Sequence, residues 1–81
     1  MPDVEAFILI EAKPGQALEL VRSVRGITGV KAVYAVTGPF DLVAHVGAPS
    51  VPELGRMVVA KIQSAAAVNR TLTCLVVEES S

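Results

Sequence analysis

The hydrophobic period of the chain switches repeatedly between that of a strand and that of a helix, and this alternation limits the possible folds more than any other feature. Residues 4–12 (VEAFILIEA) alternate with a period of two, which predicts a strand whose apolar face carries Val4, Ala6, Ile8 and Ile10. Lys13-Pro14-Gly15 interrupts the alternation, and a helical period follows from Gln16. We expect an amphipathic helix that ends near Gly26, with an apolar face of Ala17, Leu20, Val21, Val24 and Ile27.

A β-hairpin is expected in the middle of the chain. Residues 30–37 (VKAVYAVT) and 41–48 (DLVAHVGA) are rich in β-branched residues, and they flank a short turn at Gly38-Pro39-Phe40. A last strand is expected over residues 70–78 (RTLTCLVVE). Outside the outer strands we expect only polar tails, at residues 1–3 and 79–81.

A second helix is predicted between the hairpin and the last strand. Ser50 and Glu53 form a capping box, in which the Ser50 hydroxyl accepts from the Glu53 amide and the Glu53 side chain reaches back to the Ser50 amide. Pro52 suits the first turn, because its missing N–H group has no helical partner there. The helix therefore starts at Val51, and its apolar stripe consists of Val51, Leu54, Val58, Ile62 and Ala65.

These elements follow the order β-α-β-β-α-β and predict a single α+β domain over residues 1–81. Right-handed crossovers place both helices on one face of a ferredoxin-like, four-stranded antiparallel sheet. The other face lacks a helix, yet the strands are apolar on both faces, as Tyr34 and Val36 against Val33 and Ala35 illustrate. Since 52% of the chain is hydrophobic, we expect a second subunit to cover this face, which makes a homodimer the minimum assembly.

Composition argues against several classes of function. The seven basic residues are scattered and the net charge is −1, which argues against direct nucleic-acid binding. No apolar run approaches the roughly 18 residues of a membrane span, and Met1-Pro2-Asp3-Val4-Glu5 lacks the basic start of a secretory signal. A lone Cys74 forms no internal disulfide and no zinc motif, so we expect a cytoplasmic protein without metal or cofactor.

The turn between the two hairpin strands carries the most unusual local chemistry. Gly38 permits a positive φ, and Asp41 places a carboxylate where the next strand begins. Turn amides can bind the carboxylate of an amino acid while Asp41 binds its ammonium group. The same residue types also make an ordinary turn in which Asp41 caps nearby N–H groups.

Other polar residues in the strands allow weaker hypotheses. His45 and Cys74 are a conceivable base and nucleophile, but no third group is evident to orient the imidazole. We expect Cys74 to be a buried small side chain and His45 to be an interface or pH-sensitive residue. Thr71 and Thr73 point to one face of their strand, either through β-propensity alone or as ligand hydrogen-bond groups. Glu5 and Glu11 are interpreted as solvated ends of the first strand.

The segment YAVTGPFDLVAHV, residues 34–46, resembles the ligand-binding or RAM domain of the Lrp/AsnC family. The opening strand AFILIEAKPG, the KIQ of the second helix and the final TLTCLVVE agree with that resemblance. The resemblance implies a non-enzymatic ferredoxin-like domain that dimerises through its sheets, assembles into octamers or decamers, and binds small amino acids between dimers. Full-length Lrp/AsnC regulators are possible partners. The ligand residues that it implies are Thr37, Gly38, Phe40 and Asp41, with Tyr34, Thr71 and Thr73 beside them.

The chain departs from the family pattern in two places. Its first strand begins at Val4, so we expect a stand-alone form without the helix-turn-helix domain. Ala67-Val68 stands where the family resemblance leads one to expect Gly-Val. Two alternatives stay open: a dimeric α+β barrel enzyme, similar to small monooxygenases or isomerases, that uses His45, and an oligomerisation module without a ligand.

Overall fold

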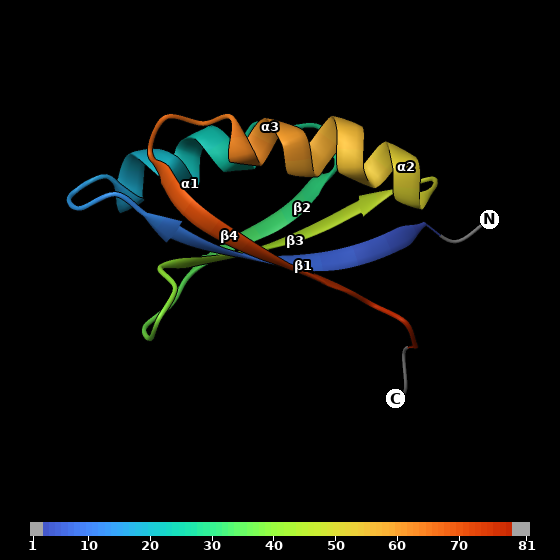
Figure 1. Ribbon diagram of the computed structural model, residues 1–81, viewed down its shortest axis with the longest axis horizontal. Helices are drawn as coiled ribbons and strands as arrows, with labels where there is room; N and C mark the ends of the chain where they lie inside the picture. The colour runs from blue at the N-terminus through green and yellow to red at the C-terminus, as the bar shows by residue number, and fades with distance from the viewer. Residues whose placement is uncertain (1–2, 79–81) are drawn as a thin grey trace.

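A sheet and a layer of helices make up the fold, which is taken from a computed structural model that describes residues 3–78. The elements are β1 (Val4–Ala12), α1 (Ala17–Arg25), β2 (Val30–Ala35), β3 (Leu42–Ala48), α2 (Val51–Glu53), the π-helical segment η1 (Leu54–Val59), α3 (Ala60–Gln63) and β4 (Val68–Leu75). The four strands are antiparallel in the order β2-β3-β1-β4, and the helices cover one face (Figure 1). This confirms the predicted ferredoxin-like α+β fold.

The core lies between the helices and one face of the sheet. Alternate residues of the two central strands are completely buried, and the predicted parity of β1 is confirmed by Ala6, Ile8 and Ile10. β3 contributes Leu42, Ala44 and Val46, while the two helices contribute Leu20, Val24, Leu54, Val58 and Ile62. Val51 is an exception within the predicted stripe, because it is 53% exposed and lines an open hollow at the end of the sheet. Val51 is the first residue of the helix, and it borders this hollow instead of entering the core.

The second helix runs as α2, η1 and α3. Its N-cap is confirmed, since the Glu53 amide donates to the Ser50 hydroxyl at 3.3 Å. The Glu53 carboxylate, however, accepts from Arg56 Nη2 at 3.0 Å, where the capping box predicted the Ser50 amide. A π-helical turn holds more residues than an α-helical one, so Leu54 and Val58 stay on the same buried side. Within residues 3–78, no helix is long and apolar enough to cross a membrane.

Two strands differ from their predicted bounds. β2 ends at Ala35, because the Val36 amide already donates to the Asp41 carbonyl, at 2.9 Å, and closes a wider loop over residues 36–41. β4 begins at Val68, after Ala67 accepts from the Lys13 amide at 2.8 Å, and ends at Leu75. The Val76 amide still donates to the Glu5 carbonyl at 2.9 Å, and the chain then leaves the sheet on the side opposite the helices (Figure 1). Of the expected polar tails, residues 1–2 and 79–81 lie outside the described residues, and Asp3 is exposed.

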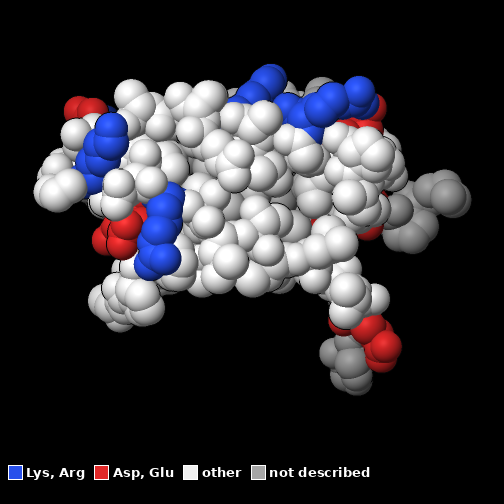
Figure 2. All heavy atoms as spheres, in the orientation of Figure 1, with Lys and Arg blue, Asp and Glu red and all other residues white. Residues whose placement is uncertain are grey.

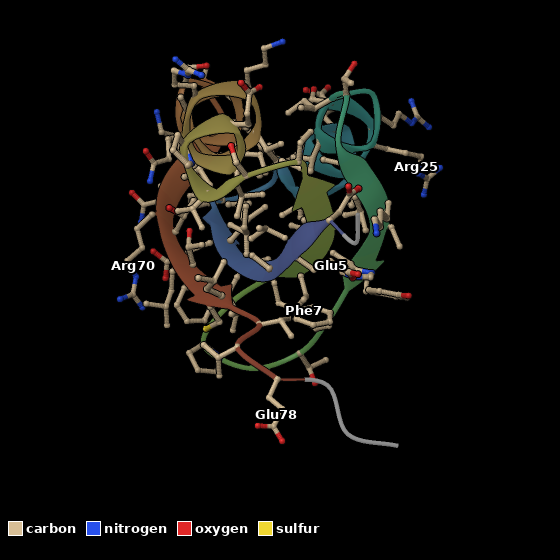
Figure 3. All side chains as sticks on the ribbon, turned by 90° about the vertical axis from the view of Figure 1, so that its right-hand side faces the viewer. Glu5, Phe7, Arg25, Arg70 and Glu78 are labelled. Carbon is tan, nitrogen blue, oxygen red and sulfur yellow. The ribbon has the colours of Figure 1, made fainter. Side chains whose placement is uncertain are left out.

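The face without helices exposes several large apolar side chains, as the sequence pattern of its strands predicted. Phe7 is 39% exposed, Tyr34 55% and Leu72 52%. Phe7 points away from the helices (Figure 3). Charged side chains gather over the helices and at the ends of the molecule, and the visible surface between them is largely uncharged (Figure 2).

Candidate functional site

The loop over residues 36–41 is fastened to the carboxyl end of β1 by Asp41. The Asp41 amide donates to the Ile10 carbonyl at 2.9 Å, and its carboxylate oxygen Oδ2 accepts from the Ala12 amide at 2.8 Å. The ladder between β1 and β3 ends at the Ile10–Leu42 pair, so β1 extends past its neighbour and needs another acceptor for Ala12. A short carboxylate at position 41 supplies that acceptor. Asp41 therefore caps a strand amide from a distant part of the sequence, while Oδ1 has no hydrogen-bond partner among residues 3–78.

The same loop presents backbone donors beside this carboxylate. Gly38 has a φ of +129°, a conformation that side chains with a Cβ rarely adopt, although a Cβ there would meet no atom within 4 Å. Glycine is thus required by backbone conformation and not by space. In the described part of the chain, no hydrogen bond engages the amides of Gly38 or Phe40. The loop therefore combines available N–H donors with a fixed carboxylate, as the sequence led us to expect.

A group of polar side chains from β1 and β4 contacts the loop at Phe40. The Arg70 guanidinium lies over the Phe40 ring, 4.9 Å from its centroid. Glu11 Oε1 accepts from Asn69 Nδ2 at 2.5 Å and lies 3.5 Å from Arg70 Nε. Glu11 is thus an ion-pair partner, and its interpretation as a solvated strand end is wrong. The sequence analysis missed Arg70 and Asn69, because only the pairing of β1 with β4 brings them to Glu11.

Three other predicted ligand residues lie on opposite faces and at opposite edges of the sheet. Thr71 and Thr73 pair with Ile10 and Ile8, which confirms that they share a face, and it is the face that carries the helices. The Thr71 hydroxyl accepts from Gln63 Nε2 at 3.1 Å. Tyr34 lies on β2, at the other edge of the sheet, and pairs with Val43 of β3. Its side chain is on the helix-free face. Within one chain, Tyr34 and the two threonines therefore stand apart, and their contact with a ligand stays a prediction.

A shallow polar hollow lies along the outer side of β4. It has a volume of about 310 Å³ and is lined by Gln63, Val68, Asn69, Arg70 and Thr71. Arg70 thus borders both this hollow and the Phe40 side of the loop. The hollow places a predicted ligand residue, Thr71, next to the guanidinium that the sequence analysis missed.

A second cluster of charged groups lies on the helix-free face, at the far end of β1. Glu5 Oε1 is 2.5 Å from His45 Nε2, and Glu5 Oε2 is 3.5 Å from Lys31 Nζ. The hydrogen bond from His45, followed by the charge of Lys31, lowers the pKa of Glu5 below its ordinary value. The Phe7 ring stacks on His45 with centroids 4.8 Å apart. Glu5, predicted to be a solvated end, is instead the centre of this cluster.

The enzyme hypothesis depended on His45, and its surroundings offer little for catalysis. His45 lines an open hollow of about 910 Å³ together with mostly apolar side chains, among them Phe7, Leu75, Val76 and Val77. His45 and Cys74 flank Phe7 on neighbouring strands, so two strand spacings, about 9.6 Å, separate them. A nucleophile and its base need hydrogen-bond contact. Cys74 is exposed on an edge strand, and the prediction that it is buried is wrong.

Comparison with known proteins gives consistent results. A family model described as the Lrp/AsnC ligand binding domain matches residues 5–81. The crystal structure of TTHA0845 from Thermus thermophilus is 36% identical and superposes with a TM-score of 0.89, covering 96% of this chain and 98% of that one. The regulator NMB0573 of Neisseria meningitidis, solved in complex with L-Met, has a TM-score of 0.85 at 22% identity and covers 96% of this chain and 52% of its own.

A curated relative extends the comparison to longer proteins. The uncharacterized HTH-type transcriptional regulator PH1916 of Pyrococcus horikoshii is 37% identical over 71 residues, which cover 84% of this chain and 47% of that protein. The chain therefore spans about half the length of the curated relatives it matches.

Proposed function

The chain belongs to the Lrp/AsnC ligand-binding family, and from this premise we propose that it binds a small amino acid as the effector of an oligomeric regulator of transcription. The observation that carries the proposal is the loop over residues 36–41, where backbone donors lie beside a fixed carboxylate. An amino acid offers the complementary pair of charges: its carboxylate suits the amides of Gly38 and Phe40, and its ammonium group suits Asp41 Oδ1. The methionine complex of the Neisseria regulator supports this class of ligand.

We also propose that the chain acts as an oligomer in the cytoplasm. The apolar face formed around Phe7, Leu72 and Tyr34 is exposed in a single chain, and a second copy of the sheet is a partner that matches it. Further assembly into octamers or decamers brings residues of different subunits together, which is one way for Tyr34, Thr71 and Thr73 to reach a common ligand. Longer Lrp/AsnC regulators are proposed as additional partners, because the curated relatives are about twice as long as the match.

Thermal denaturation with each of the twenty amino acids tests effector binding. A ligand at about 100 times its dissociation constant adds about 2.7 kcal/mol of stability, a rise in Tm on the order of 10 °C for a domain of this size. Asp41→Asn keeps an oxygen for the Ala12 amide but removes the charge that the ammonium group requires. A tenfold loss of affinity would reduce the added stability to about 1.4 kcal/mol, so we expect the ligand-induced shift to fall by about half.

Two further variants complete this experiment. Asp41→Ala also loses the bond to Ala12, so it should lower the Tm without ligand, at a cost of about 1 kcal/mol. Asp3→Asn makes the same change at an exposed carboxylate near the opposite end of β1 and should leave the shift intact. A folded wild-type protein whose Tm ignores all twenty amino acids would contradict the proposal and favour a ligand-free oligomerisation module.

A further inference from the structure

Arg70 carries hydrogen-bond donors without partners among residues 3–78, at the edge of the proposed effector site. A guanidinium carries five N–H groups in a planar fork. Arg70 Nε lies 3.5 Å from Glu11 Oε1, and the guanidinium carbon Cζ lies over the Phe40 ring, 4.9 Å from its centroid. No partner among residues 3–78 engages Nη1 or Nη2, and the side chain is 60% exposed. Arg70 therefore presents the end of its fork to solvent.

The guanidinium of Arg70 lies next to the loop over residues 36–41. Phe40 precedes Asp41 in the loop, and Glu11 precedes Ala12, whose amide binds Asp41. Arg70 contacts Phe40 and Glu11, which are the sequence neighbours of Asp41 and Ala12. Arg70 therefore lies close to the hydrogen bond between Asp41 and Ala12. Figure 3 shows Arg70 on β4, apart from Glu5. Lys31 and Arg56, by contrast, pair with Glu5 and Glu53 in other parts of the molecule.

We propose that Arg70 binds the carboxylate of the effector, so that the site selects ligands with a free carboxylate. This inference rests on the proposed amino-acid binding and names the residue that recognises one end of the ligand. Arginine suits the role because its fork can donate two parallel hydrogen bonds to one carboxylate. Asp41 Oδ1 is then available for the ammonium end, and the amides of Gly38 and Phe40 share the carboxylate with Arg70.

The neighbours of Arg70 orient its fork without occupying it. The Phe40 ring contacts the guanidinium through Cζ, and neither Nη1 nor Nη2 has a hydrogen-bond partner among residues 3–78. Glu11 Oε1 is shared between Arg70 Nε and Asn69 Nδ2, which keeps the carboxylate on the Nε side. An exposed ion pair of this kind contributes little free energy, so a ligand carboxylate can bind the Nη groups without overcoming a strong contact. The arrangement therefore holds the fork in place and keeps it free to bind.

A purely structural role for Arg70 makes a different prediction. If Arg70 only supports the loop through Phe40, its loss should weaken every ligand by the same factor. If it binds the carboxylate, its loss should remove the preference for a carboxylate over an uncharged group of the same shape. Comparing an amino acid with its α-carboxamide separates the two roles, because the ligands differ only at the group that Arg70 would contact.

The experiment adds each of the twenty amino acids to the ¹⁵N-labelled full chain and follows the Arg70 Nε–Hε signal and the amides of Gly38 and Phe40 by NMR. Calorimetry then measures each binder and its α-carboxamide on wild type, Arg70→Gln and Arg70→Lys. We expect wild type to prefer the amino acid by about 10- to 100-fold, and Arg70→Gln to bind both ligands about equally. Arg70→Lys keeps the charge without the fork and should show an intermediate preference.

Arg56→Gln is the matched control, since it removes an arginine whose partner is Glu53 on the second helix. It should keep the wild-type preference. If an amino acid shifts the loop amides while Arg70→Gln keeps the full preference for the carboxylate, the role of Arg70 is overturned and the proposed function stands. If no amino acid shifts any signal of the folded protein, the proposed function fails and this inference fails with it.

Discussion

Gly47 shows how the absence of one side chain shapes the charged cluster on the helix-free face. Gly47 lies opposite Glu5 in the ladder between β3 and β1. A Cβ on Gly47 would lie 2.8 Å from Lys31 Cε. Because Gly47 has no side chain, the Lys31 side chain can extend across the sheet over this position. Lys31 thereby reaches Glu5 from β2, while His45 reaches it from β3. A carboxylate on a central strand thus contacts side chains from two other strands.

Glu5 should make the stability of the folded chain depend on acid pH. Its pKa is lowered in the folded state by His45 and Lys31, so ionised Glu5 stabilises the fold above its unfolded pKa of about 4.3. That contribution is lost as the pH falls through the lower folded pKa. We expect Glu5→Gln to lower the Tm at pH 7, and the difference from wild type to shrink as the pH falls from 7 through the unfolded pKa of about 4.3 and then through the lower folded pKa. Thermal denaturation over that range measures the difference.

Glu19→Gln provides the comparison for this titration. Glu19 is exposed in the first turn of α1, away from the Glu5 cluster. Its replacement should give a Tm difference from wild type that is smaller at pH 7 than that of Glu5→Gln. A Glu5→Gln variant whose Tm tracks wild type at every pH would show that the cluster contributes nothing to stability.

At the scale of elements, periodicity predicted the helices and central strands well and the connections less well. The bounds of β1 agree with the prediction because alternation and the Lys13-Pro14-Gly15 break are both local signals. The hairpin loop is wider than predicted, since Val36 N–H pairs with the carbonyl of Asp41 and not with a strand partner. The π-helical segment η1 could not be predicted from the apolar stripe of Leu54, Val58 and Ile62, because a spacing of four residues fits both an α-helix and a π-helix.

Two glycines with open surroundings should respond oppositely to alanine. A Cβ added to Gly55 in η1 or to Gly38 in the hairpin loop would meet no atom within 4 Å, so space does not distinguish the two positions. Gly55 lies inside this helical segment and is not among the glycines with a positive φ, so Gly55→Ala should add about 0.5–1 kcal/mol and raise the Tm by several degrees. Gly38 has a φ of +129°, and Gly38→Ala should cost about 1 kcal/mol or more. Urea unfolding of both variants measures the two changes; a loss of stability in Gly55→Ala would contradict this account.

At the scale of the whole molecule, the two layers leave one apolar face without a cover. Leu72 is 52% exposed there and pairs with Leu9 of β1, whereas Leu18 is 79% exposed on α1 in the helix layer. Burying that face against a second sheet removes apolar surface from water, which is the main favourable term in association. The size of the assembly in solution is therefore the property that this face should control.

Leucine-to-aspartate changes at these two positions test which face pairs. Leu72→Asp would place a charge inside the proposed sheet-to-sheet contact, where desolvating an unpaired carboxylate is costly. We expect it to shift the protein from dimer or larger to monomer, as measured by size-exclusion chromatography with light scattering. Leu18→Asp makes the same change on the helix layer and should keep the dimer. An unchanged mass for folded Leu72→Asp would place the contact elsewhere.

The element order, the apolar faces, the uncovered side of the sheet and the turn at Gly38 and Asp41 could be predicted from the sequence, because each depends on residues close together along the chain. The contacts between polar groups could not, because they join residues that are far apart in the sequence. Asp41 meets Ala12 across 29 residues, Glu5 meets His45 across 40, and Glu11 meets Asn69 across 58. Such contacts depend on strand register and on the shift between Glu11 and Ala12 in the pairing of β1 with β4. Periodicity assigns a residue to a face, but the register that places it opposite a partner is set by packing over the whole sheet.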